Sequence, residues 1–184
     1  MILGLDVSTS TIGYSVLDSE GKMLELGFLS LKKANNLLEK ADIYEAFLLK
    51  LKLKYSFSRV FIEEAFQRYS RGMSSARTIT LLAAFNGIIQ YVNYKVLRIT
   101  PELISVSSAR KLCGIKVLSK KKAGKEVKEQ VFEWVDRHLG YEWPTKILRN
   151  GPRKGIEIML PETRDMADAW VVSFAGFVQS TQVN

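Results

Sequence analysis

Four acidic residues stand where the sequence predicts that a strand ends or a helix begins. Asp6 follows the apolar start of the chain, and Glu63 follows a second apolar run. Asp165 and Asp168 lie three residues apart at the start of the last helical segment, so both project from one side of its first turn. An ionised carboxylate beside buried strand residues is costly unless a cation or hydrogen-bond donors meet it.

Taken singly, each of these acids has a structural explanation. Asp6 could cap a turn, Glu63 could face solvent, and the two later aspartates favour a helix N-terminus. Taken together, packed carboxylates raise one another's pKa unless cations neutralise them. Hard divalent ions with oxygen ligands, Mg²⁺ or Mn²⁺, do this. Two such ions about 3.5 to 4 Å apart can activate a water and stabilise the leaving oxygen in phosphodiester cleavage.

The elements that would position these acids begin with a meander. Residues 2–6, 12–18 and 23–31 have the composition and alternation of strands, and short polar turns separate them. Apolar residues then recur at helical spacing from 34 to 55, and 58–62 forms a short buried strand. Three antiparallel strands, a helix and a returning strand predict a mixed α/β sheet. Asp6 and Glu63 would then both lie at strand ends.

The second half of the chain is predicted to be mostly helical. Residues 77–94 are apolar nearly all round, which indicates a helix in the core or, alternatively, one partly against another subunit. The other expected elements are a strand at 95–99, a helix at 107–113, an amphipathic helix from Lys125, and a last helix at 163–178. Residues 140–163 suit an irregular loop or hairpin with 155–160 as a strand arm.

Composition restricts the class of protein. A chain of 184 residues without an evident linker is expected to form one domain, residues 1–184. One cysteine, Cys113, and one histidine exclude an intramolecular disulfide and a zinc site. No stretch resembles a signal peptide or a membrane span, so we expect a cytosolic protein with no membrane contact. The net charge of +8 favours a polyanionic partner.

Two basic segments could meet such a partner. Residues 66–76 interleave aromatic and basic side chains, and residues 116–128 hold the densest run of lysines. Cations at a helix N-terminus oppose the helix dipole, so a bound anion near Lys125 would relieve a local cost. A solvated lysine loop explains the second run about equally well.

Three stretches together resemble one known family. They are ILGLDVSTSTIGYSVL at the start, VFIEEAF in the middle and DMADAWVVS at the end. In this order and at these distances they resemble the RuvC-type Holliday junction resolvases of the RNase H-like superfamily, most of all the divergent versions carried by bacteriophages. The likeness extends over nearly the whole chain.

The resemblance implies a fold, a chemistry and a set of partners. The fold would be an RNase H-like, mixed five-stranded sheet of three antiparallel and then parallel strands, flanked by helices. The protein would be a homodimeric, Mg²⁺-dependent endodeoxyribonuclease of DNA recombination and repair, with two ions in each active site and Mn²⁺ as a substitute. It would nick four-way junctions and other branched DNA in pairs, leaving 5′-phosphate and 3′-hydroxyl ends. A phage-encoded version would work in the bacterial cytoplasm.

The resemblance also implies roles for individual residues. Asp6, Glu63, Asp165 and Asp168 would be the catalytic metal ligands, with Glu64 as an alternative to Glu63. Phe66 falls on an aromatic that stacks near the junction, and Lys125 falls on a DNA-contacting lysine at a helix start. The whole expected DNA-binding set is Phe66, Arg68, Tyr69, Arg71, Arg110, Lys111, Lys120, Lys121, Lys122, Lys125 and Lys128.

The sequence departs from the family pattern in several places, and two other functions stay open. The turn after Asp6 is Ser-Thr-Ser instead of Pro-Gly-Ser, and residues 114–125 and 140–162 are expanded. Cleavage preference and junction selectivity therefore do not follow from the resemblance. The first alternative is a sugar-kinase or actin-like ATPase lobe, which also opens with a strand, an Asp and a polar turn. The second is a protein that binds branched DNA without cutting it.

Overall fold

The computed structural model describes residues 1–65 and 76–182. Its main sheet has five strands in the spatial order β3-β2-β1-β4-β5. The strands are β1 (Ile2–Val7), β2 (Thr11–Leu17), β3 (Met23–Ser30), β4 (Arg59–Glu63) and β5 (Glu102–Ile104). Strands β1, β2 and β3 pair antiparallel, whereas β1, β4 and β5 pair parallel. The mixed five-stranded sheet expected from the sequence is therefore confirmed.

Six helices and a separate hairpin complete the described part of the chain. The helices are α1 (Leu37–Lys54), α2 (Ala76–Leu97), α3 (Val106–Leu112), α4 (Lys120–Ala123), α5 (Val127–Leu139) and α6 (Thr163–Gln182). The hairpin consists of β6 (Thr145–Ile147) and β7 (Glu157–Met159). None of the helices described here is long and apolar enough to cross a lipid bilayer.

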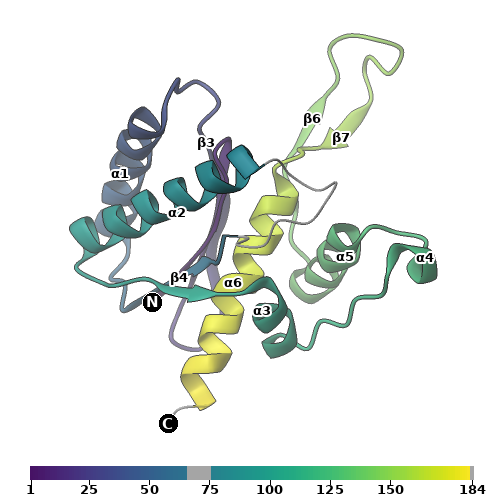
Figure 1. The fold of residues 1–184 in the computed structure, drawn as a ribbon. Helices are drawn as coiled ribbons and strands as arrows, with labels where there is room; N and C mark the ends of the chain where they lie inside the picture. The colour runs from purple at the N-terminus through teal and green to yellow at the C-terminus, as the bar shows by residue number, and fades with distance from the viewer. Residues whose placement is uncertain (66–75, 183–184) are drawn as a thin grey trace.

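The sheet is covered by helices on both faces (Figure 1). Helices α1 and α2 cover one face, and α6 crosses the other with α3 and α5 packed on its outer side. Because side chains alternate along a strand, Leu3 and Leu5 enter the core under α1 and α2. Ile2 enters the core under α6. Asp6 shares the parity of Ile2 and so belongs to the α6 face.

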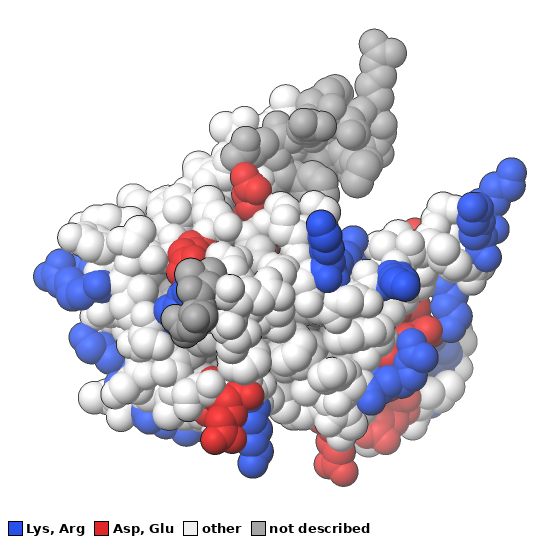
Figure 2. Space-filling view, turned by 90° about the horizontal axis from the view of Figure 1, so that it is seen from below, with Lys and Arg blue, Asp and Glu red and all other residues white. Residues whose placement is uncertain are grey.

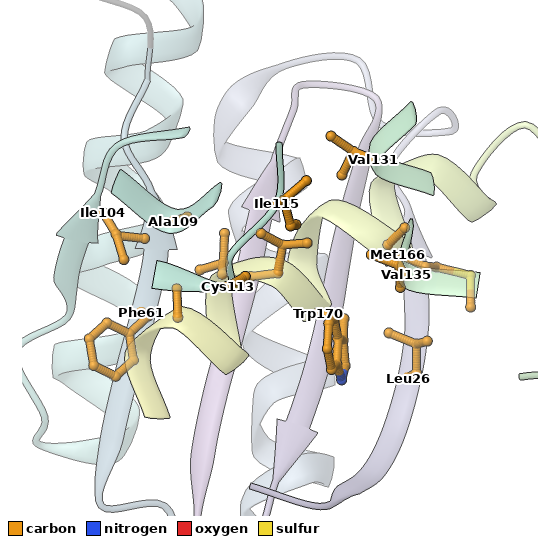
Figure 3. Close-up of a cluster of buried hydrophobic side chains, with 14 of the residues drawn as sticks. Leu26, Phe61, Ile104, Ala109, Cys113, Ile115, Val131, Val135, Met166 and Trp170 are labelled. Carbon is orange, nitrogen blue, oxygen red and sulfur yellow. The ribbon is translucent and has the colours of Figure 1, made fainter. Parts of the chain in front are cut away.

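The core on the α6 face joins the helices to the sheet (Figure 3). Trp170 and Met166 of α6 lie against Val131 and Val135 of α5, while Phe61 of β4 closes the other side. Trp170 is almost fully buried and stacks on Phe174 with ring centroids 4.8 Å apart. Large buried rings fix the position of α6 firmly. The first turn of α6, with Asp165, is therefore held at a defined place on the sheet.

One sequence expectation for α2 is wrong, and one of the two alternatives for its burial is excluded. The strand expected at residues 95–99 does not form, because α2 continues to Leu97 and the next strand begins at Glu102. The helix is also not wholly in the core, since Leu81 is 44% exposed, Tyr91 64% and Tyr94 48%. Tyr91 and Tyr94, three residues apart, leave one apolar side of α2 uncovered in the described chain. Apolar residues on a helix predict that the helix is buried, but they do not identify the surface that covers each side.

Candidate active site

Asp6 lies near the end of β1, facing the first turn of α6. Its partner in the β2 register is Gly13. A Cβ atom on Gly13 would lie 2.1 Å from the carbonyl oxygen of Asp165, so only glycine lets α6 approach the sheet this closely. Gly4 has the same role further along, where a Cβ would lie 2.4 Å from the Cβ of Ser173. These two glycines bring the helix that carries Asp165 down beside Asp6.

Glu63 ends the neighbouring parallel strand. Leu5 pairs with Ile62, so Asp6 and Glu63 follow at the same edge of the sheet. Glu63 lies two residues after Phe61 and therefore shares the α6 face of the sheet with it, whereas strand alternation directs the next residue, Glu64, to the opposite face. Glu64 is held by its backbone N–H, which donates to the carbonyl of Ile104 at 3.0 Å. The geometry therefore favours Glu63 over Glu64 as the member of the acidic group.

Asp165 and Asp168 come from the start of α6, and one basic side chain meets them. The Nζ atom of Lys128, near the start of α5, lies 3.7 Å from Oδ2 of Asp168. The side chain of Asp168 is only 13% exposed, whereas that of Lys128 is 63% exposed. Lys128 thus reaches from solvent to the rim of the acidic group. Lys125, the lysine that the family resemblance favoured, instead pairs with Glu133.

The four carboxylates act on one another electrostatically. Burial and the charges of Glu63, Asp168 and Asp165 raise the pKa of Asp6 well above its ordinary value. Burial and Asp168 raise the pKa of Glu63 to about 7. Burial is also the main cause that raises the pKa values of Asp165 and Asp168, which Lys128 partly opposes. A cluster of acids with raised pKa values in one place is typical of a functional site.

The acidic group fits a hard divalent ion. Among the residues described, no three or more His, Cys, Asp or Glu side chains are drawn together as a ready metal site. The charges of Glu63, Asp168 and Asp165 nevertheless contribute to the raised pKa of Asp6, and those of Asp168 and Asp165 contribute to that of Glu63. Like charges without a cation between them repel and keep their side chains apart. All four donors are oxygens, which suits Mg²⁺ or Mn²⁺.

Asn86 of α2 supports the site from the opposite face of the sheet. Its Nδ2 atom donates to the backbone carbonyl of Glu63 at 3.0 Å, and its Oδ1 atom accepts from Gln90 at 2.8 Å. Asn86 is buried with an exposure of 4%. Since this bond fixes the backbone that carries Glu63, Asn86 acts as a positioning residue.

For a nuclease of the kind that the sequence resemblance implies, replacing Asn86 by Ala is expected to slow DNA cleavage by about tenfold while leaving DNA affinity unchanged, because a displaced carboxylate weakens the reacting geometry more than binding. Asn93→Ala is the matched control, since Asn93 is a buried asparagine of the same helix that hydrogen-bonds Tyr44 instead. Single-turnover cleavage and DNA titration of both variants make the comparison. Equal cleavage losses in the two variants would mean that Asn86 acts through stability alone.

The expected DNA-binding residues divide into three groups. Phe66, Arg68, Tyr69 and Arg71 lie outside the described residues. Arg110 and Lys111 line an open hollow together with Ser107, Lys116 and Val117. The charge of Arg110 opposes part of the rise in the pKa values of Glu63 and Asp168. Lys120, Lys121 and Lys122 form α4, whose C-cap is Gly124 in the left-handed conformation.

Ion pairs moderate the charge of this lysine-rich region. Lys120 lies 2.5 Å from Glu126, and Lys125 pairs with Glu133. Seen from below, basic side chains project from the side of the molecule on which α4 and α5 lie, with acidic side chains among them (Figure 2). The surface is therefore basic in excess but not uniformly so.

Sequence reasoning missed three features of the site. Gly13 contacts α6, and Asn86 hydrogen-bonds the backbone of Glu63. Both contacts join segments far apart in the sequence, so no local sequence pattern predicts them. Lys128 was expected to bind DNA but not to lie against Asp168. A signal was present, because Val131 and Val135 follow Lys128 by three and seven residues and place it on the inward side of α5.

Comparisons with known proteins add evidence on the fold. No family model and no curated protein matches the sequence. A solved structure of Thermus thermophilus RuvC with a Holliday junction substrate matches with a TM-score of 0.66, covering 98% of this chain and 95% of that one at 14% identity. The fold is that of RuvC. A second T. thermophilus RuvC structure gives 0.59, covering 98% and 96% at 18% identity.

The yeast mitochondrial Holliday junction resolvase Ydc2 matches as well, with a TM-score of 0.54 and 20% identity. The match covers 99% of this chain and 79% of the yeast chain. The RuvC-type fold that the sequence resemblance implied is thus confirmed across almost the full length. At these identities the likeness concerns the fold, and the function is argued from the site.

Proposed function

We propose that this protein is a divalent-metal-dependent endonuclease that resolves four-way DNA junctions by paired nicks. The observation that carries the proposal is the group of four carboxylates with raised pKa values at the edge where β1, β4 and α6 meet. Support comes from the RuvC fold and from the T. thermophilus protein with that fold, which was solved with a Holliday junction substrate.

Different residues of this chain would have different roles in the reaction. Asp6, Glu63, Asp165 and Asp168 would hold two Mg²⁺ ions, or Mn²⁺ in their place. When bound, such ions activate a water and stabilise the leaving oxygen. Lys128 offsets part of the negative charge beside Asp168, and its ammonium group is placed to contact a phosphate that approaches the acids. The expected products are a 5′-phosphate and a 3′-hydroxyl, which a ligase can rejoin.

The uncovered side of α2 supports a homodimer. Tyr91 and Tyr94 are exposed there, and a Cβ atom on Gly87, four residues before Tyr91, would meet nothing within 4 Å. An exposed apolar helix side of this kind favours contact between two copies. Two copies would present two active sites to one junction, which paired nicking requires.

The lysines of α4 are expected to bind DNA phosphates. Replacing Lys120, Lys121 and Lys122 by Ala should weaken DNA binding and lower the slope of log affinity against log salt by about two to three, since each phosphate contact contributes about 0.9. The effect of Lys120 is expected to be the smallest, because Glu126 already pairs with it. Titrations at several salt concentrations measure the slope. An unchanged slope would make α4 an ordinary solvated segment.

A panel of DNA substrates tests the proposed function. Labelled four-way junction, replication fork and linear duplex are incubated with the protein in Mg²⁺ and in EDTA. The proposal expects cutting of the junction in Mg²⁺ alone and little cutting of linear duplex. Tight binding without nicks would favour a non-cleaving junction binder. If the protein neither binds nor nicks the junction, the proposal is wrong.

A further inference from the structure

The β6–β7 hairpin projects from the body of the molecule (Figure 1). Thr145 pairs with Met159 and Ile147 with Glu157, and the ladder continues through Leu148, whose N–H donates to the carbonyl of Ile156 at 3.0 Å. The tip turns through Gly151 and Gly155, which have φ values of 83° and 87°. The arm is thus a defined two-stranded ribbon and not an irregular loop.

The outer part of this ribbon is basic. Its cationic residues are Lys146, Arg149, Arg153 and Lys154. Glu157 is the one acid between residues 145 and 159, and it accepts a hydrogen bond from Thr145 at the base of the hairpin. Arg149, Arg153 and Lys154 are exposed, and Lys146 and Arg149 line an open hollow along the arm. The tip therefore presents positive charge to solvent.

The base of the hairpin is joined directly to the acidic group. Three residues, 160–162, separate β7 from α6, which carries Asp165. The Oγ1 atom of Thr163 donates to the carbonyl of Leu160 at 2.8 Å. Glu162 pairs with Lys32 at 2.5 Å, which ties the hairpin base to the segment between β3 and α1. The arm consequently starts at the end of the molecule where the candidate active site lies.

We infer that the hairpin, residues 145–159, holds the phosphates of a DNA duplex arm at a distance from the branch point. The inference rests on the proposed function and names an additional contact surface for the same DNA. Charge complementarity supports it, and a two-stranded ribbon has the width that a DNA major groove admits. Strand geometry gives a reach of up to about 20 Å from base to tip. That length corresponds to about six base pairs of duplex.

The hairpin also exposes apolar side chains, since Ile147 is 64% exposed, Ile156 49% and Met159 45%. A second copy of this chain is therefore the competing occupant. The charges favour DNA, because two copies of a basic tip repel each other whereas phosphates attract it. The experiment below separates the two.

The test uses Arg149→Ala/Arg153→Ala and, as a matched control, Lys22→Ala/Lys50→Ala. The control removes two exposed cations, from the turn before β3 and from α1, toward the sheet end opposite Asp6. Binding is measured in Ca²⁺ or EDTA over a salt series. One four-way junction has arms of about fifteen base pairs, and another has arms of about four, each closed by an uncharged linker without phosphates. The tip variant should lose about tenfold or more in affinity for the long-armed junction, with a salt slope shallower by about two. The control should match the wild type.

On the short-armed junction the tip variant and the wild type should bind equally, because the tip then meets no phosphates. Equal salt slopes for the tip variant and the control on long arms would overturn the inference. So would a tip variant that dissociates into smaller species in sedimentation without DNA, which would assign the hairpin to contact between two copies. Failure of the wild type to recognise junctions would instead remove the proposed function. In that case the hairpin is tested on long linear duplex, where the salt slope of the tip variant should still be shallower than that of the control.

Discussion

Replacing Asp6 by Asn is expected to reduce junction cleavage by about a thousandfold or more while leaving junction binding intact. Asp6 is buried among the other three acids, and their charges raise its pKa, so it lies at the centre of the group. An amide of the same shape removes a metal ligand, and losing several kcal/mol of metal-assisted stabilisation corresponds to a thousandfold or more in rate. DNA affinity should not fall, because the substitution takes away a negative charge beside the phosphates. Single-turnover cleavage and equilibrium binding measure the two effects separately.

The matched control for Asp6→Asn is Asp42→Asn, an exposed position on α1. This change removes the same charge away from the acidic group, so cleavage and binding should both stay at the wild-type level. If Asp6→Asn cuts junctions as fast as the wild type, Asp6 has no part in the chemistry. If both variants lose cleavage equally, the loss comes from net charge and not from the site.

The stability of the metal-free protein is expected to fall as the pH rises from about 4.5 to 7. The pKa of Glu63 is raised from 4.5 to about 7, mainly by burial and by Asp168. The folded state therefore binds this proton more tightly than the unfolded state does, and raising the pH through the interval removes that advantage. One pKa unit is worth about 1.4 kcal/mol, so Glu63 corresponds to a loss of about 3 kcal/mol. Denaturant unfolding in EDTA at pH 5 and pH 8 measures the difference.

The control for this prediction is Glu63→Gln, in which the loss of stability between pH 4.5 and 7 should be smaller than in the wild type by the contribution of Glu63. Part of the loss should remain, because the pKa values of Asp6, Asp165 and Asp168 are raised as well. Glu25 and Glu162 do not confuse the comparison. Burial of Glu25 acts to raise its pKa, but hydrogen bonding and ion pairing with Lys54 lower it overall. The pKa of Glu162 is lowered by its pairing with Lys32. The stability that those acids contribute is lost below about pH 4.5 and not in this interval. Adding Mg²⁺ at pH 8 should restore stability to the wild type more than to Glu63→Gln. Identical pH profiles for the two proteins would contradict the electrostatic account.

Local hydrophobic patterns in the sequence were sufficient to predict most of the fold. Strand alternation and helical spacing report which faces are buried, so β1 to β4, α1 and α6 could be predicted with nearly correct ends. The position of Asp6 and Glu63 near strand ends, and of Asp165 and Asp168 near a helix start, could be predicted from the same patterns. Their role as metal ligands stays a prediction. Residues 95–99 were misassigned because their apolar residues continue the helical spacing of α2, and a short apolar run does not distinguish the two periods.

Features that depend on contact across the fold could not be predicted. Gly13 matters because α6 approaches it, and Asn86 matters because it meets the carbonyl of Glu63 from another helix. The sequence of residues 140–162 allowed a hairpin, but the projection of its basic tip from the α6 end is a tertiary property. Dimer formation through α2 stays a prediction for the same reason.

The most direct measurement uses a supercoiled plasmid that extrudes a cruciform. In Mg²⁺ the protein is expected to convert it to linear DNA through two symmetric nicks within one binding event, and a ligase should seal the resulting hairpin ends. In EDTA, or with Asp6→Asn, the plasmid should stay supercoiled although the protein binds. Open circles as the main product would contradict paired cutting. Cleavage that persists in EDTA, or no cleavage at all in Mg²⁺, would contradict the assignment of the four carboxylates as a metal-dependent nuclease site.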